Sequence, residues 1–183
     1  MTESRLPSGL TRIRWIAHCV RVMAVIAMVT VVGFQWWFWS DAAWVQRTAT
    51  TDWNLTGPMQ LDVMARGSAA VVNLPATLLT LYALMCLWRL FGCYLRAEVF
   101  TAPAAHHLRR LGQAVIAMAV VTPLTQTATI IALTLGNPPG KRQLIVGLSS
   151  QHYIVLLCGL VLLAMALIMR EAQRMAQENA EFV

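Results

Sequence analysis

The chain has 183 residues, of which 58% are hydrophobic and 12% charged, and its formal net charge is +6 at pH 7. A charged share about half that of an ordinary globular protein leaves too little polar surface to cover a soluble core, so the composition excludes an ordinary soluble domain. The basic residues, thirteen of the fourteen being arginine, sit in short clusters beside apolar runs, which argues against direct binding of nucleic acid.

Four apolar runs dominate the sequence, each about 18 residues or longer and therefore long enough to cross the hydrocarbon core of a bilayer. They lie at residues 15–39, 69–91, 113–135 and 152–169. This pattern predicts an all-α fold, a single polytopic membrane domain over residues 1–183 that is built as a bundle of four transmembrane helices. The rest of the chain is assigned to an outer loop, a cytoplasmic hairpin and a cytoplasmic tail helix, at residues 40–68, 92–112 and 170–183.

The distribution of basic residues predicts which ends of these helices face the cytoplasm. About ten of them flank the ends nearest the hairpin and the two termini, and about four lie toward the other side. Because cytoplasmic segments carry the excess of Lys and Arg, both termini are expected inside (N-in, C-in), with helical extensions on that side. Lys141 and Arg142 are the main departure from this bias.

Charged side chains gather on the predicted cytoplasmic side, namely Arg96, Glu98, Arg109, Arg110, Arg170, Glu171 and Arg174. The sequence has no phosphate loop, nucleophile elbow, zinc motif or dinucleotide fingerprint, and its few acidic residues are dispersed, so an enzyme is disfavoured. We therefore expect a non-enzymatic signalling or regulatory protein whose hairpin and tail hold a cytoplasmic protein. The alternative is that these charges only fix the orientation and bind membrane lipids through anionic headgroups.

A polar site is also predicted within the membrane, formed by Thr122, Pro123, Thr125 and Gln126 of the third run and Asn73 of the second. Asn73 is expected to pair the backbone groups that Pro75 frees by removing a helix hydrogen bond. Many carriers build a site from kinked helices with polar groups at mid-membrane, so a small transporter or transport accessory subunit is the competing hypothesis. A bundle this small would form a pathway only as a homo-oligomer. Hydrogen bonds between neighbouring helices are the structural alternative.

Two further features concern packing inside the bilayer. Arg21 lies about two turns inside the first run, where its side chain either snorkels to the inner interface or makes an ion pair or substrate contact within the bundle. Ala128, Ala132 and Gly136 recur every four residues, which predicts the close approach of a neighbouring helix.

Three histidines lie near the predicted inner interface, namely His18, His106 and His107. Because helix bundles can hold haem or a metal between facing helices, a haem- or metal-binding membrane protein is a further alternative. Histidines at such positions are more often interfacial or solvated side chains, so neither a cofactor nor a metal site is assigned. The cysteines lie within or beside apolar runs and indicate helix packing rather than disulfides; they are Cys19, Cys86, Cys93 and Cys158.

The segments YLRAEVFTAPAAHHLRRLG, at residues 94–112, and MREAQRMAQENAEFV, at residues 169–183, carry a family resemblance. They resemble a bacterial family of small four-helix inner-membrane proteins, grouped under a domain of unknown function and often encoded beside a small helix-turn-helix regulator. Its most recognisable parts are a turn of the GEVF type, in which Ala97 replaces the glycine, and the basic run at residues 108–112. The resemblance covers essentially the whole chain. It implies a multi-pass location in the bacterial inner (plasma) membrane and a regulatory setting, without an established activity.

Overall fold

The computed structural model describes most of the chain, and every regular element in the described part is an α-helix. The described residues are 8–53, 55, 59, 61–96, 98, 101–137, 145–147 and 149–181. Side chains are described from residue 14 in the first helix and as far as residue 178 in the last. The predicted turn around Ala97, Val99 and Phe100, and the basic pair Lys141 and Arg142, therefore lie outside the described residues.

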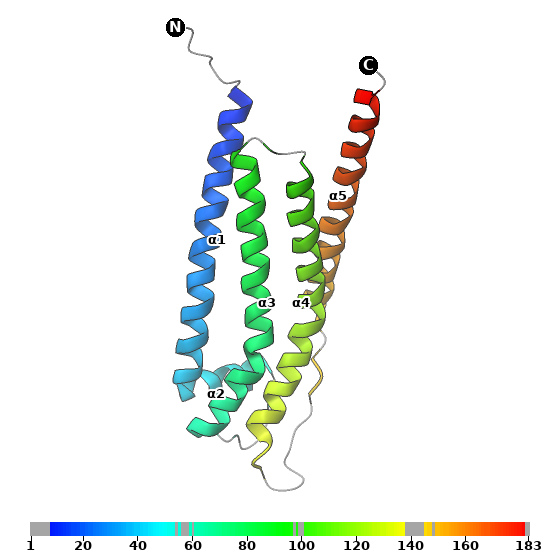
Figure 1. Ribbon diagram of the computed structural model, residues 1–183. Helices are drawn as coiled ribbons and strands as arrows, with labels where there is room; N and C mark the ends of the chain where they lie inside the picture. The colour runs from blue at the N-terminus through cyan, green and yellow to red at the C-terminus, as the bar shows by residue number, and fades with distance from the viewer. Residues whose placement is uncertain are drawn as a thin grey trace. The chain divides into compact units, whose positions relative to one another are not determined.

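Four long helices and one short helix follow one another along the chain (Figure 1). They are α1 (Ser8–Ser40), α2 (Ala42–Thr51), α3 (Val63–Leu95), α4 (Ala102–Thr134) and α5 (Ser150–Glu181). The four long ones are apolar enough and long enough to cross a membrane, so the predicted all-α fold with four membrane-spanning helices is confirmed. At 32 or 33 residues each is about 48 Å long, against roughly 30 Å of hydrocarbon core, so every span continues as helix beyond the bilayer.

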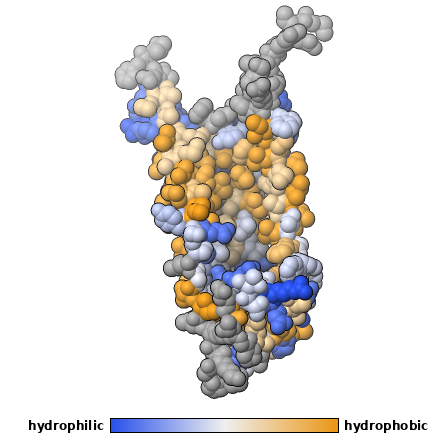
Figure 2. Space-filling view, turned by 180° about the vertical axis from the view of Figure 1, so that it is seen from behind, coloured by the Kyte–Doolittle hydropathy of each residue, from blue (hydrophilic) through white to orange (hydrophobic). Residues whose placement is uncertain are grey.

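The outer surface of these helices suits lipid rather than water. Large apolar side chains are exposed along them, for example Trp15, Val29, Leu124 and Ile168. Figure 2 shows such side chains, in orange, over much of one face. In α1, α3 and α5 only 11% of the most apolar window is buried, against 28% in α4, so α4 makes the most contact with the rest of the protein.

The chain divides into two compact units, and each long helix contributes one part to each of them. Unit 1 contains Met1–Met28, Tyr82–Ile116 and Leu157–Val183, and it holds the predicted hairpin and tail. Unit 2 contains Val29–Leu81 and Ala117–Leu156, and it holds α2.

Within unit 1, α4 and α5 meet at two glycines. A Cβ added to Gly112 would lie 2.9 Å from the backbone nitrogen of Leu163 and 3.1 Å from the carbonyl oxygen of Gly159. A Cβ added to Gly159 would lie 2.9 Å from the backbone nitrogen of Ile116. Because backbone atoms rather than flexible side chains occupy this space, the two helices can approach so closely only where both residues lack a side chain.

Within unit 2, the short helix α2 turns back from the end of α1. The carboxylate of Asp41 accepts a hydrogen bond of 2.9 Å from the backbone N–H of Ala43 and caps the helix. Val45 and Ala49 are fully buried on its inner side. Val45 belongs to an apolar cluster that also contains Trp39, Ala69 and Leu133. Ala49 belongs to a second cluster, with Leu55 and Ile130. The sequence analysis assigned this segment to the outer loop and did not predict the helix.

The repeat of small residues predicted at positions 128, 132 and 136 covers less of α4 than expected. Ala132 packs against the first of these clusters. Gly136 lies beyond the last residue of α4 and is exposed, so the repeat does not continue along the helix as far as this glycine.

Reporter fusions test the predicted orientation. Fusions after Arg96 and after Val183 are expected to give a cytoplasmic signal, because the excess of arginine lies at that side. Fusions within residues 48–56 or near Gly140 are expected to give an outside signal. Enzyme reporters that are active on only one side of the membrane measure this. A cytoplasmic signal from Gly140 would contradict the four-span arrangement.

Candidate functional site

A polar cavity in unit 2 brings together four of the five residues predicted to form a site within the membrane. It has a volume of about 400 Å³ and is lined by Phe34, Gln35, Phe38, Trp39, Thr48, Asp52, Trp53, Asn73, Thr122, Thr125, Gln126 and Thr129. Asn73, Thr122, Thr125 and Gln126 are the predicted members. Pro123 is buried in α4 but is not among the lining residues. This polar cavity is small-molecule sized.

Two residues that line the polar cavity each have a nitrogen atom that is buried without a hydrogen-bond partner among the described residues. The atoms are Nε2 of Gln35 and Nε1 of Trp39, both on α1. The side-chain oxygen of Gln35 is engaged, since it accepts a 3.5 Å hydrogen bond from Nδ2 of Asn73 on α3. An unpaired buried donor costs about 1–3 kcal/mol, so a solute that supplies acceptor atoms would relieve a cost already present.

This contact corrects the role expected of Asn73. Its side chain was expected to pair the backbone groups that Pro75 frees, whereas it reaches across to Gln35 on another helix. The carbonyl of Asn73 accepts a 3.2 Å hydrogen bond from the Thr77 hydroxyl, two residues beyond the proline. This is an ordinary threonine bond within the helix, since the carbonyl that Pro75 frees is that of Val71, and the Asn73 amide joins α1 and α3 instead.

The threonine hydroxyls of α4 near Pro123 bond to backbone carbonyl groups. The Thr125 hydroxyl lies 3.0 Å from the carbonyl oxygen of Val121 and 2.9 Å from that of Thr122. The Thr127 hydroxyl lies 2.9 Å from the Pro123 carbonyl oxygen and 3.2 Å from that of Ile145. These hydroxyls are therefore already satisfied, and the amides contribute more than the threonines to any site.

The turn just after α2 supplies an acidic and an aromatic residue that the sequence analysis did not name as site residues. Asp52 and Trp53 line the polar cavity and also a second cavity of about 700 Å³ in the same unit. Thr122 and Gln126 are shared by both cavities as well. Gln126 also faces Gly147, where an added Cβ would lie 3.7 Å from its Nε2. Gln35 carried a usable signal, since it is a polar residue at the aromatic end of the first run.

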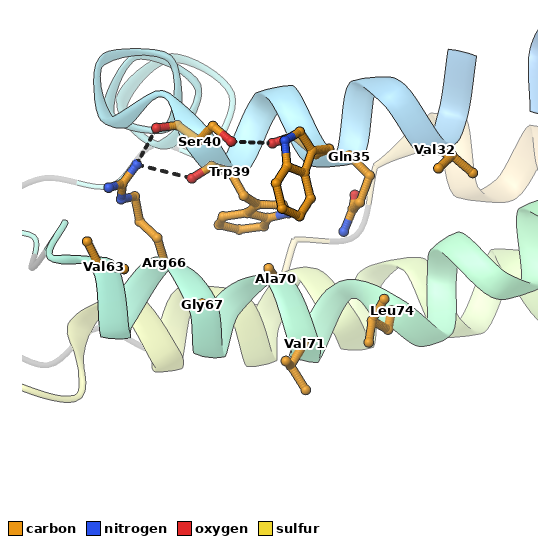
Figure 3. A pocket seen from close by; sticks show the side chains of 11 residues that line it. Val32, Gln35, Trp39, Ser40, Val63, Arg66, Gly67, Ala70, Val71 and Leu74 are labelled. Carbon is orange, nitrogen blue, oxygen red and sulfur yellow. Dashed lines mark hydrogen bonds between the residues drawn. The ribbon is translucent and has the colours of Figure 1, made fainter. Parts of the chain in front are cut away.

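A groove near the end of α1 lies beside the polar cavity residues Gln35 and Trp39 (Figure 3). It has a volume of about 620 Å³ and is lined mainly by apolar residues of α1 and α3, including Val32, Val63, Ala70 and Leu74. Arg66 closes one end, where its Nη1 donates to the carbonyl oxygens of Trp39 at 3.1 Å and Ser40 at 2.6 Å. Arg66 was placed in the outer loop by the sequence analysis, and it ties α3 to the end of α1.

The charged residues predicted to bind a partner fall into separate places in unit 1. Arg109 and Arg170 line one groove, of about 180 Å³, between α4 and α5. Arg96 is 3.6 Å from Glu98, and Arg174 is 3.8 Å from Glu171 and 2.9 Å from Glu178, all in exposed ion pairs. Arg110 donates instead to the Tyr82 hydroxyl of α3 at 3.2 Å. Of the seven residues, only Arg109 and Arg170 therefore share one groove.

Within the part of the chain that the structure describes, no cluster of side chains supports the hypothesis of a metal site. No group of three or more His, Cys, Asp or Glu side chains gathers there. His106 and His107 are neighbours, with ring centroids 5.9 Å apart, and all four cysteines are free thiols.

Four helices that are long and apolar enough to cross a bilayer define a multi-pass integral membrane protein. The family model described as "Protein of unknown function (DUF2975)" matches residues 39–183. The chain belongs to this family, which confirms the resemblance to a domain-of-unknown-function family. No similar curated protein or solved structure was found.

Proposed function

We propose that this chain is a non-enzymatic regulatory protein of the bacterial inner membrane, which binds a small polar solute in the polar cavity and contacts a cytoplasmic protein. The observation that carries the proposal is the pair of buried, unpartnered donors on Gln35 and Trp39. The carboxylate of Asp52 lines the same cavity, so the wall offers hydrogen-bond donors and a negative charge together. A solute with acceptor oxygens and a cationic or hydroxyl group complements this wall.

A variant of Gln35 tests solute binding. Gln35→Leu is expected to unfold close to the wild-type temperature, because it removes one unpaired donor but also leaves Nδ2 of Asn73 without its acceptor. A panel of amino acids, polyols and amines is first screened for solutes that raise the unfolding temperature of the wild type. Gln35→Leu is expected to bind these solutes about tenfold more weakly, because hydrogen bonds to a buried amide are lost.

The matched control is Gln46→Leu, the same change at an exposed position of α2. Thermal unfolding of the purified protein in detergent, with and without each solute, measures the effect. If Gln35→Leu and Gln46→Leu respond alike to every stabilising solute, the polar cavity is not the binding site.

The proposed partner surface is the groove between α4 and α5. Buried Ala105 and Ala166 form part of its floor, and Arg109 and Arg170 are exposed at its rim. Nε2 of Gln173, which also lines the groove, is buried without a partner among the described residues. A narrow groove with a small-residue floor and a basic rim fits an acidic helical or extended segment of another protein.

Charge reversal tests this surface. Arg109→Glu combined with Arg170→Glu is expected to reduce in-cell crosslinking to the partner by about tenfold or more, because like charges now face an acidic segment. Arg110→Glu is the control, since Arg110 contacts Tyr82 and does not line the groove. Membrane insertion and protein level are measured in parallel. Equal crosslinking in both variants would indicate that these charges only fix the orientation of the protein in the membrane and bind lipid.

Transport remains the second candidate, and the sharing of Asp52, Trp53, Thr122 and Gln126 by the two cavities favours it. Two polar spaces with a common wall offer a solute more than one position in unit 2. Assembly of a homo-oligomer would be needed for a complete pathway. Solute accumulation in cells that express wild type or Gln35→Leu separates the candidates: a changed accumulation favours transport, and an unchanged one favours regulation.

A further inference from the structure

A second pocket, in unit 1, gathers cationic side chains that neither the solute site nor the partner groove uses. Its volume is about 590 Å³, and it is lined by residues that include Arg21 of α1, Arg89 of α3, Arg96 just after α3 and His107 of α4. No acidic residue is among its lining residues. Arg96 forms an ion pair with Glu98 at 3.6 Å, and both side chains remain partly exposed.

Arg21 is held in this arginine pocket by an aromatic ring. Its guanidinium carbon lies 4.2 Å from the centroid of the Trp88 ring on α3. Gly92 leaves room beside it, since an added Cβ would lie 4.0 Å from the same carbon. The contact ties Arg21 to a neighbouring helix of the same unit, and snorkelling to the inner interface stays a prediction. Stacking fixes the guanidinium plane while its edge keeps donors available.

One of those donors has no partner. Nε of Arg21 is buried and without a hydrogen-bond partner among the described residues. A buried guanidinium nitrogen in a pocket of like charges is unfavourable unless an anion joins it. Planar guanidinium groups bind phosphate oxygens through paired hydrogen bonds, which makes a phosphate the best complement to two or three arginines in one pocket.

His107 adds to the pocket without a fixed charge. Burial lowers the pKa of His107, and the neighbouring His106, Arg89 and Arg110 lower it further. The ring is therefore neutral at neutral pH, and the permanent positive charge of the pocket comes from the arginines.

The surface next to Arg21 identifies the source of the phosphate. Val22, Met23, Val25 and Ile26, which follow Arg21 on α1, are all exposed apolar side chains of a membrane-spanning helix. An occupant that reaches Arg21 along this surface must carry an apolar part beside its phosphate. We propose that the arginine pocket binds the phosphate group of an anionic phospholipid, whose acyl chains lie along α1.

Native mass spectrometry of the full-length protein in neutral detergent tests this proposal. Phosphatidylglycerol is expected to remain bound to the wild type in preference to phosphatidylcholine. The double variant Arg89→Gln with Arg96→Gln, both at exposed positions, is expected to retain about tenfold less phosphatidylglycerol, since it loses charge-assisted hydrogen bonds to phosphate. Arg21→Lys, which keeps the charge but not the planar fork, is expected to lose retention in part.

The control removes two exposed arginines that do not line the pocket, as Arg14→Gln with Arg47→Gln. It should retain the lipid within about twofold of the wild type, because exposed charges outside the pocket are screened. Equal losses in the control and the pocket variant would overturn the proposal, as would equal retention of the two lipids by the wild type. Inorganic phosphate is the second probe. If phosphate alone stabilises the wild type and displaces the lipid at low millimolar concentration, the pocket serves a soluble anion and the lipid assignment is wrong.

Discussion

Replacing Gly112 by alanine is expected to destabilise the protein by about 1–3 kcal/mol, which is the usual effect of forcing extra atoms into a packed contact. The new Cβ would lie 2.9 Å from the backbone nitrogen of Leu163 and 3.3 Å from its Cα. Since those are backbone atoms, the clash can be relieved only by moving α5 away from α4. Alanine favours a helix by roughly 0.5–1 kcal/mol over glycine, so the measured loss is net of that gain.

Gly159 provides an independent view of the same contact. Its added Cβ would meet Ile116 at two points, 2.7 Å from the side-chain atom Cγ1 and 2.9 Å from the backbone nitrogen. The side chain can rotate away and the backbone cannot, so Gly159→Ala is also expected to destabilise. A double substitution should cost less than the sum of the two, because both residues hold one helix crossing.

Gly33→Ala is the matched control, since nothing lies within 4 Å of the Cβ it would add. This variant is expected to be unchanged or slightly stabilised through helix propensity. Unfolding temperatures in one detergent compare the three variants. A Gly112→Ala protein as stable as Gly33→Ala would show that α4 and α5 do not pack through these glycines.

The sequence predicted the spanning helices well because their signal is local. Hydropathy over about 20 residues reports each helix separately, without knowledge of its neighbours. The second span was predicted to end at residue 91, whereas α3 continues to Leu95, because an apolar run stops at the interface while its helix goes on. The helical tail predicted after the fourth span is present and runs to Glu181. Helix α2 escaped prediction because its Thr-rich sequence has low intrinsic helix propensity, which the Asp41 cap and the buried Val45 and Ala49 overcome.

The contacts between helices were harder to predict than the helices. Four members of the intramembrane polar site were named from polarity alone, yet the contact from Asn73 to Gln35 joins residues 38 positions apart. Gly112 was noted only as the end of a basic run, because nothing in its neighbourhood reveals that Gly159 lies opposite. Arg110 was grouped with Arg109 by adjacency, although successive helix residues point about 100° apart and contact different partners.

Replacing Arg66 by methionine is expected to destabilise unit 2 by about 2–4 kcal/mol, because it removes two hydrogen bonds from a charged donor. The last carbonyl groups of a helix have no partner within that helix, and a cation there also complements the helix dipole. Arg66 satisfies two of these groups, on Trp39 and Ser40, across 26 or 27 residues of sequence. Arg66→Lys should recover only part of the loss, since a single ammonium cannot reproduce the planar fork.

Arg47→Met is the control for Arg66→Met, as it removes an exposed arginine of α2 and should change stability by less than about 0.5 kcal/mol. The unfolding temperature is the first measurement, and solute-dependent stabilisation is the second. Trp39 lines both the groove beside Arg66 and the polar cavity, so a loosened α1 end should also weaken solute binding. If Arg66→Met matches Arg47→Met in stability while solute binding persists, the two carbonyl contacts neither hold the end of α1 nor support the polar cavity.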